Sequence, residues 1–84
     1  MPTYRVQVIV LPRPALLDPE GETITNAAHR LGYGQIQQIR AGRAFVLDIQ
    51  TTSPEEALRL GEALADQLLH NPVVETYEVS LLSK

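Results

Sequence analysis

The stretch QIQQIRAGRAFVLDIQ (residues 35–50) determines how the strands of this chain are connected, and it contains two β-type segments. Residues 36–40 form the first segment, and residues 43–50 form the second, in which apolar positions recur with period two. The Ala41-Gly42 pair between them is typical of a tight turn, so a β-hairpin is the preferred interpretation. A single long strand with a glycine bulge is the alternative.

A strand and a helix precede this stretch. Residues 3–11 alternate in polarity and are rich in β-branched side chains, and Pro12 ends the predicted strand because it cannot donate to a ladder. Asp18-Pro19-Glu20 predicts a helix start, since Asp18 can cap free amides and proline suits the first helical position. Gly32 suits the end of this helix. Its apolar stripe consists of Ile24, Ala27, Ala28 and Leu31.

A second helix and a last strand follow it. Ser53-Pro54-Glu55-Glu56 is a capping box with proline in the first turn, the strongest local signal in the chain. Gly61 lies within this helix and permits close packing. Asn71-Pro72 ends the helix, and residues 73–81 alternate as a strand. The apolar stripe of the helix consists of Ala57, Leu60, Leu64 and Leu68.

The element order β-α-β-β-α-β predicts an α+β fold, namely a ferredoxin-like antiparallel sheet with both helices on one face. The 84 residues suffice for one domain, which we expect to span residues 1–84. A chain this short buries little surface by itself, so we expect it to form an oligomer. The uncovered sheet face would carry Ile9, Leu11 and Val46, or the opposite set of side chains if the register differs. Apolar residues on this face make it a candidate subunit contact.

Composition excludes several classes of partner. The net charge is −3 and the arginines are scattered, which argues against binding to nucleic acid. The longest purely apolar runs have four residues, and no signal peptide opens the sequence, so we expect no membrane association. The chain has no cysteine, which excludes disulfides and thiolate metal sites and favours a cytoplasmic location.

The polar residues do not form a catalytic pattern. His29 fits a surface histidine, and His70 fits a cation at a helix end. The adjacent glutamates lie at helix starts, where carboxylates are favoured electrostatically, and no nucleophile is paired with a base. We therefore predict no catalytic, cofactor-binding or metal-binding residue. Arg40 and Arg43 flank the predicted turn, where they serve either as contacts to an acidic partner or as solvated charges.

Four segments together resemble the PurS family, a small subunit of phosphoribosylformylglycinamidine synthase. They occur in the family's order and at matching spacing over essentially the whole chain. They are LLDPEG (16–21), AHRLGY (28–33), IRAGR (39–43) and LLHNPVVETY (68–77). The third segment has arginine where the family has lysine.

This resemblance implies a non-catalytic part of a glutamine-dependent ligase complex in de novo purine biosynthesis. Such a subunit would dock the glutaminase subunit onto the large, ATP-dependent synthetase subunit, so that ammonia reaches formylglycinamide ribonucleotide. ATP and Mg²⁺ would belong to the complex, and this chain would bind no cofactor. The resemblance also implies homodimers, some of them paired into tetramers. The residues expected at partner contacts are Leu17, Asp18, Pro19, Glu20, Gly21, His29, Tyr33, Arg40 and Arg43.

A small-molecule-sensing, ferredoxin-like regulatory module is the alternative function, because domains of this type often bind effectors at dimer edges. It predicts saturable binding of an amino acid or a nucleotide by the isolated chain. An independent small enzyme ranks third, since no acid, base or nucleophile is paired.

Overall fold

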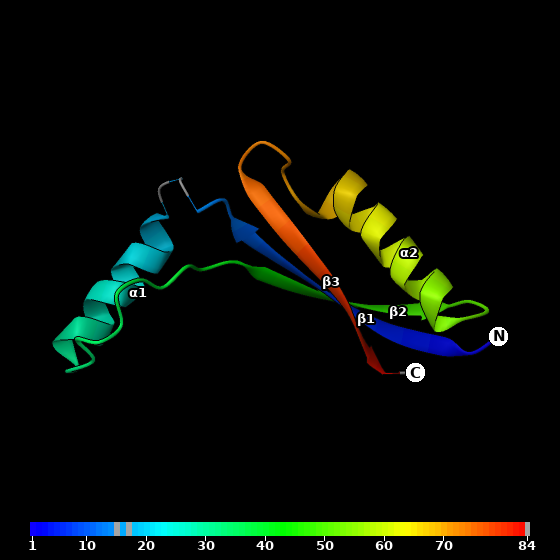
Figure 1. The fold of residues 1–84 in the computed structure, drawn as a ribbon, viewed down its shortest axis with the longest axis horizontal. Coiled ribbons are helices and arrows are strands. Elements are labelled where there is room, and N and C mark those ends of the chain that lie inside the picture. Colours follow the sequence, from blue (N-terminus) through cyan, green and yellow to red (C-terminus); the bar gives the residue numbers. More distant parts are fainter. Residues whose placement is uncertain (15, 17, 84) are drawn as a thin grey trace.

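A computed structural model describes residues 1–14, 16 and 18–83 of the chain. The three strands form one antiparallel sheet in the order β2-β1-β3 (Figure 1). The α+β class and the antiparallel sheet are therefore as predicted, whereas the element order is β-α-β-α-β. The elements are β1 (Thr3–Pro12), α1 (Pro19–Arg30), β2 (Arg43–Gln50), α2 (Pro54–Leu64), the π-helical turn η1 (Ala65–Leu69) and β3 (Glu75–Ser83).

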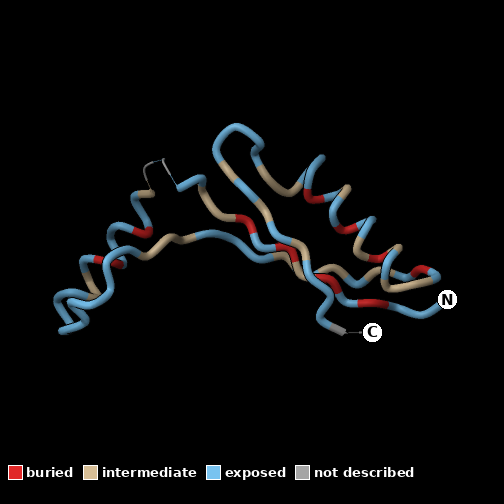
Figure 2. Tube along the Cα trace, in the orientation of Figure 1, coloured by how far each residue is buried: buried red, intermediate tan, exposed pale blue. Residues whose placement is uncertain are grey.

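The central strand β1 supplies most of the core. Its alternate residues Tyr4, Val6, Val8 and Val10 are buried on the face that α2 covers (Figure 2). Period-two alternation places these four side chains on one face, where they pack against inward-facing residues of β2 and β3. None of the described helices covers the other face. It carries exposed Ile9 and Val46 as predicted, and Leu11 is half-buried.

Small residues let α2 lie close to the sheet. The side-chain oxygen of Ser53 accepts a hydrogen bond from the Glu56 amide at 3.1 Å, and Pro54 begins the helix, as the capping box predicts. The buried face of the helix consists of Ala57 and Gly61, continued by Ala65 in η1. The larger members of the predicted stripe lie beside this contact and are exposed, namely Leu60, Leu64 and Leu68.

Helix α1 begins as predicted but does not cover the sheet. The Asp18 side chain accepts from the Gly21 amide, and Gly32 has a φ of 103° just after the helix ends. The helix lies beyond the end of the sheet, whereas α2 contacts all three strands (Figure 1). Because no strand lies under it, its predicted apolar stripe is open: Ile24 is 43% and Leu31 is 78% exposed. The prediction that both helices cover one face is therefore wrong for this chain.

The predicted hairpin is also absent. Residues 36–40 form no strand, and the chain passes through Ala41-Gly42 without reversing, directly into β2 (Figure 1). The alternative of one long run is closer to the structure, although residues 36–42 have no ladder partner. Gly42 does not serve a turn. It lies against β1, where an added Cβ would collide with the Val10 carbonyl oxygen.

The chain is elongated for its size. Its radius of gyration is 16.1 Å, against about 12 Å expected for a compact domain of this length. Its extents are 50 × 27 × 14 Å, and the long axis runs from the sheet to the far end of α1 (Figure 1). Buried residues cluster on β1 and the inner side of α2, whereas the part around α1 is mostly exposed (Figure 2).

We predict that Gly61→Val lowers the free energy of unfolding by about 1–3 kcal/mol, because it overfills the contact between α2 and β1. A Cβ at this position would already lie 2.9 Å from the Val6 Cγ1 atom, and valine adds two further methyl groups. Urea unfolding at a fixed protein concentration measures the change.

Gly34→Ala is the matched control, because nothing lies within 4 Å of a Cβ added there. It should change the free energy of unfolding by less than about 1 kcal/mol. Equal destabilisation by the two substitutions would show that α2 does not depend on the close approach at Gly61.

Candidate functional site

Residues 18–42, here called the arm, are held together by the carboxylate of Asp18. One carboxylate oxygen accepts the Gly21 amide at 3.1 Å, and the other accepts the Ala41 amide at 2.8 Å. The arm thus joins the start of α1 to the residues that enter β2. Gly21 is required here, because an added Cβ would collide with the Ile39 carbonyl oxygen and with the Asp18 carboxylate.

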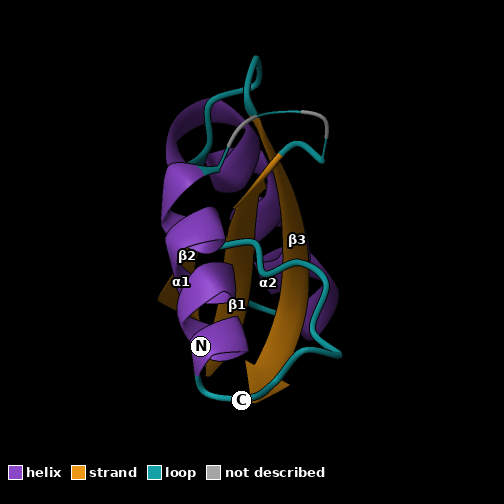
Figure 3. Cartoon of the chain, turned by 90° about the vertical axis from the view of Figure 1, so that its left-hand side faces the viewer, coloured by secondary structure: helices purple, strands orange, loops and turns teal. Residues whose placement is uncertain are grey.

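Two further side chains of α1 bind the same extended run. The hydroxyl of buried Thr25 donates to the Gly21 carbonyl at 2.7 Å and accepts the Ile39 amide at 2.9 Å. The Nε2 atom of His29 lies 2.6 Å from the Ile36 carbonyl oxygen, so Nε2 carries the proton. The helix and residues 36–41 therefore form one unit, nearest the viewer when the molecule is seen along its length (Figure 3).

Arg40 fastens this unit to the sheet. Its guanidinium donates to the Pro12 carbonyl oxygen at the end of β1. Hydrogen bonds from the Ala41 and Gly21 amides hold the pKa of Asp18 below its ordinary value, the positive charge of Arg40 adds to this, and lost hydration opposes it. The carboxylate therefore stays ionised over the whole physiological pH range.

A shallow groove of about 320 Å³ lies between α1 and the extended run. Carboxylates, side-chain amides and the ring of His29 line it together with Leu16 and Ile39, so it offers both hydrogen bonds and apolar contact. In the described part of the chain, no three histidine, aspartate or glutamate side chains gather where they could hold a metal ion. None of the described helices is long and apolar enough to cross a membrane.

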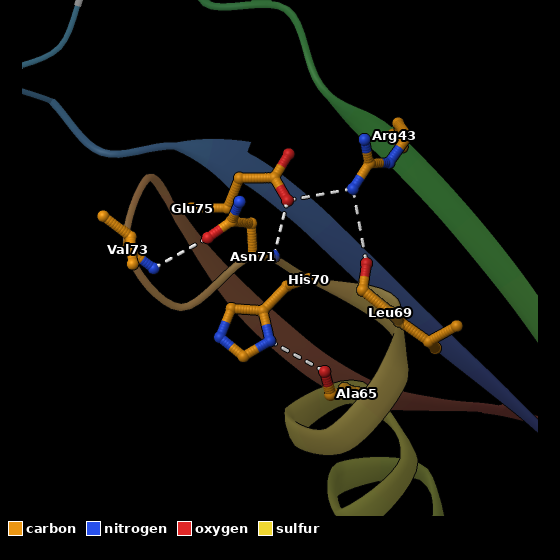
Figure 4. Close-up of polar contacts among 7 residues, drawn as sticks. All are labelled: Arg43, Ala65, Leu69, His70, Asn71, Val73 and Glu75. Atoms are coloured by element: carbon orange, nitrogen blue, oxygen red, sulfur yellow. Dashed lines mark hydrogen bonds and ion pairs between the residues drawn. The ribbon is translucent and has the colours of Figure 1, made fainter.

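Arg43 belongs to a second cluster, at the turn that leads into β3 (Figure 4). Its guanidinium donates to the Glu75 carboxylate at 2.9 Å and to the Leu69 carbonyl at 3.3 Å, and it lies 5.9 Å from the centre of the Phe45 ring. The same carboxylate oxygen of Glu75 accepts the Asn71 amide at 2.8 Å. Arg43 therefore fixes the turn that contains Asn71-Pro72, while its side chain stays 55% exposed.

His70 lies beside this cluster, where the sequence predicts a helix-end cation. Its Nδ1 atom is 2.8 Å from the Ala65 carbonyl oxygen at the end of the helix (Figure 4). Its ring meets that of Tyr77 edge to face, with centres 4.7 Å apart. His70 therefore links the helix end to β3.

The structure brings together part of the predicted contact set. Asp18, Gly21, His29 and Arg40 meet in the arm, whereas Arg43 lies apart in the cluster with Glu75. Pro19 and Glu20 are exposed in the first turn of α1, and Tyr33 is exposed just beyond its end. Leu17 lies outside the described residues. A role in partner contact stays a prediction for all nine.

Sequence reasoning missed an apolar groove of about 520 Å³ beside α2, on the side of β2. Its two leucines, Leu60 and Leu64, belong to the predicted apolar stripe of the helix. The small residues Ala57, Gly61 and Ala65 already form a row that can face the sheet. The leucines beside this row are more than that contact needs, and this surplus is the sequence signal for the groove. The groove is lined by Val46, Leu47, Asp48, Ile49, Leu60 and Leu64.

The family model of PurS, described as phosphoribosylformylglycinamidine (FGAM) synthase, matches residues 5–83. The chain belongs to the PurS family. The resemblance in the four sequence segments is thereby confirmed, and the chain is a subunit of phosphoribosylformylglycinamidine synthase, an activity of purine biosynthesis. Membership of this family favours the subunit over the effector-sensing module.

Individual PurS proteins align with this chain over most of their length. The PurS subunit of Mycobacterium leprae is 36% identical over 90% of this chain and 92% of its own. The crystal structure of the Thermotoga maritima purS subunit matches with a TM-score of 0.88 and 31% identity, covering 96% of this chain and 93% of that one. A chain in the structure of PurLQS from Thermotoga maritima matches with a TM-score of 0.87 and 32% identity, covering 98% and 100%.

We predict that the amide protons of Ala41 and Gly21 shift together in NMR spectra as acid is added, with a midpoint below 3.8, the ordinary pKa of aspartate. Because the folded-state pKa of Asp18 is lowered, its stabilising bonds are complete above the ordinary value. They are lost as the pH falls through the lowered pKa.

Asp18→Asn should remove this step, because the amide side chain has one acceptor oxygen and does not titrate. Glu20→Gln, two residues away, should leave the step unchanged. A midpoint at or above 3.8 in the unaltered protein would contradict the bridging role of Asp18.

Proposed function

We propose that this chain is a non-catalytic subunit that docks the glutaminase subunit onto the ATP-dependent synthetase subunit of the synthase. The observation that carries the proposal is its likeness, over nearly the whole chain, to the chain within PurLQS. Docking sets the ammonia source beside the ammonia acceptor, which limits loss of ammonia to water. In this proposal ATP and Mg²⁺ bind the synthetase subunit, and this chain holds no cofactor.

The distribution of apolar side chains supports a docking role. Two exposed apolar regions are separated along the length of the molecule, one on the arm and one beside α2. Contiguous apolar surface of this kind marks protein contacts. The arm contributes Ile24, Leu31, Tyr33 and Ile36.

The size of the exposed surface supports a homodimer. In this proposal, two such dimers can associate into a tetramer. The chain exposes 5847 Å², whereas a compact protein of 9.3 kDa exposes about 5,000 Å². The excess is close to the roughly 800 Å² that each partner contributes to a standard interface. The absence of cysteine suits a reducing compartment, and we place the assembly in the cytoplasm.

Reconstitution tests the docking role. We expect the mixed synthetase and glutaminase subunits to lose glutamine-dependent formation of formylglycinamidine ribonucleotide when this chain is omitted. Turnover with a high concentration of ammonium salt should persist, because free ammonia needs no docked source. Both rates are measured from product formed in the same subunit mixture.

Adding the chain back is the control, and it should restore the glutamine-dependent rate without changing the ammonium-dependent rate. Full glutamine-dependent turnover without the chain would defeat the docking role. Loss of both rates would show that the chain supports the synthetase site itself.

Sedimentation velocity tests the homodimer. We expect the isolated chain to sediment at twice the mass of the 9.3 kDa monomer, or as a pair of such dimers. We also expect its Tm to rise with protein concentration, because association stabilises the folded chain by mass action. A monomer at concentrations of about 100 µM, with a Tm independent of concentration, would contradict the proposal.

A further inference from the structure

The turn at residues 71–74, here called the β3 turn, leads from η1 into β3 and bonds its own amides. The Asn71 amide donates to the Glu75 carboxylate at 2.8 Å, and the Asn71 side chain accepts the Val73 amide at 3.0 Å (Figure 4). The Asn71 carbonyl accepts the amides of Val74 and Glu75. Proline at position 72 has no amide, so every amide of the turn has an acceptor.

Arg13 binds the carbonyls of the β3 turn. Its Nη2 atom donates to the Pro72 carbonyl at 2.7 Å, and its Nε atom donates to the Val73 carbonyl at 3.2 Å. Its own amide donates to the Val74 carbonyl at 2.9 Å. A proline stands on each side of Arg13 in the sequence, which limits the freedom of the backbone that carries it. All backbone donors and acceptors of the turn are therefore bonded, and it cannot add a strand to a partner's sheet.

The side chains that this turn presents to solvent are apolar. Val73 is 76% exposed, and Leu68, at the helix end before the turn, is 71% exposed. Exposed apolar side chains on a backbone with no open polar group suit contact with an apolar surface. Because the conformation of the turn is fixed before association, little conformational entropy is lost when a partner binds it. The β3 turn therefore has the features of a preformed contact for another protein.

Arg13 also indicates the chemistry of that protein. Two of its nitrogens, Nε and Nη2, bind the turn, and a guanidinium has further donors, so its Nη1 side stays free. None of the described carboxylates pairs with Arg13, whereas three other arginines each have a carboxylate partner. A guanidinium with a free side fits a carboxylate in a bidentate pair. The surface that complements the β3 turn therefore combines an apolar pocket with a carboxylate beside it.

We propose that the β3 turn docks into an apolar pocket on one of the larger subunits of the synthase, with a carboxylate on the rim of that pocket. Val73 enters the pocket, and the carboxylate pairs with the free side of Arg13. The same guanidinium then holds the turn in shape and binds the partner. This inference rests on the proposed docking role and specifies one contact through which the docking occurs.

Reconstituted synthase tests the contact with a matched pair of charged variants. Val73→Asp places a charge on the apolar tip of the turn, whereas Thr76→Asp places it three residues further on, at an exposed position of β3. The measured quantity is the concentration of this chain that gives half of the maximal glutamine-dependent rate, with both larger subunits present. We expect Val73→Asp to raise that concentration about 30-fold or more, and Thr76→Asp to raise it less than about threefold.

The outcomes separate this contact from the docking role itself. Equal effects of the two variants would overturn the contact while leaving docking intact. No stimulation by the unaltered chain would defeat the docking role and the contact with it. We expect Val73→Asp to keep the Tm of the unaltered chain, because Val73 is exposed and lies outside the described core. Should this variant fail to fold, the crosslinking described below decides the question.

Two substitutions of Arg13 test the carboxylate on the partner. Arg13→Lys keeps the positive charge but loses the fork that binds the turn and a carboxylate together. Arg13→Met removes the charge as well. We expect the half-maximal concentration to rise about tenfold for Arg13→Lys and about 100-fold for Arg13→Met. Equal losses would show that Arg13 only holds the turn, which would overturn the carboxylate partner.

Photocrosslinking identifies the partner in the same mixture. The chain has no cysteine, so Leu68→Cys gives a single attachment point for a benzophenone just before the β3 turn. Thr52→Cys, at an exposed position before the start of α2, is the control. We expect Leu68→Cys to label one larger subunit, and Thr52→Cys to give no crosslink to the same peptide of that subunit. Labelling confined to other copies of this chain would overturn the proposal.

Discussion

The carboxylate of Asp18 is the interaction on which the shape of this molecule depends. It accepts two amides that are far apart in the sequence, one at the start of α1 and one just before β2. A helix and an extended run of chain thereby become one body, and Gly21 keeps the space between them clear. Together with the bonds that Thr25 and His29 make to the same run, this bridge gives α1 a defined direction, although the helix has no sheet beneath it.

Local signals predicted the elements but not their placement. The cap at Ser53, the cap at Asp18 and the alternation in β1 are short-range patterns, and each has its predicted structure. The fourth strand and the position of α1 depend on what residues 36–42 meet, and their own chain offers them no ladder. Ala41-Gly42 predicted a turn because glycine favours turns, whereas here glycine allows a close passage beside Val10.

The candidate site was predicted in part, for a related reason. The segments that resemble the PurS family are separate in the sequence, and the fold brings them together as pairs. Asp18 binds Ala41, and Arg43 binds Glu75, which in turn holds the amide of Asn71 (Figure 4). A capping residue in the sequence predicts only the hydrogen bond to an amide in the first turn of its own helix. The second bond of Asp18, and the docking of Arg43 onto a distant turn, require the tertiary structure.

The thinness of the molecule bears on the route that ammonia takes through the complex. Its shortest dimension is 14 Å, little more than the diameter of one helix with its side chains. A subunit this thin has most of its residues at the surface. In the proposed docking role, ammonia that passes it would therefore travel along a boundary between subunits, which this chain helps to close off from water.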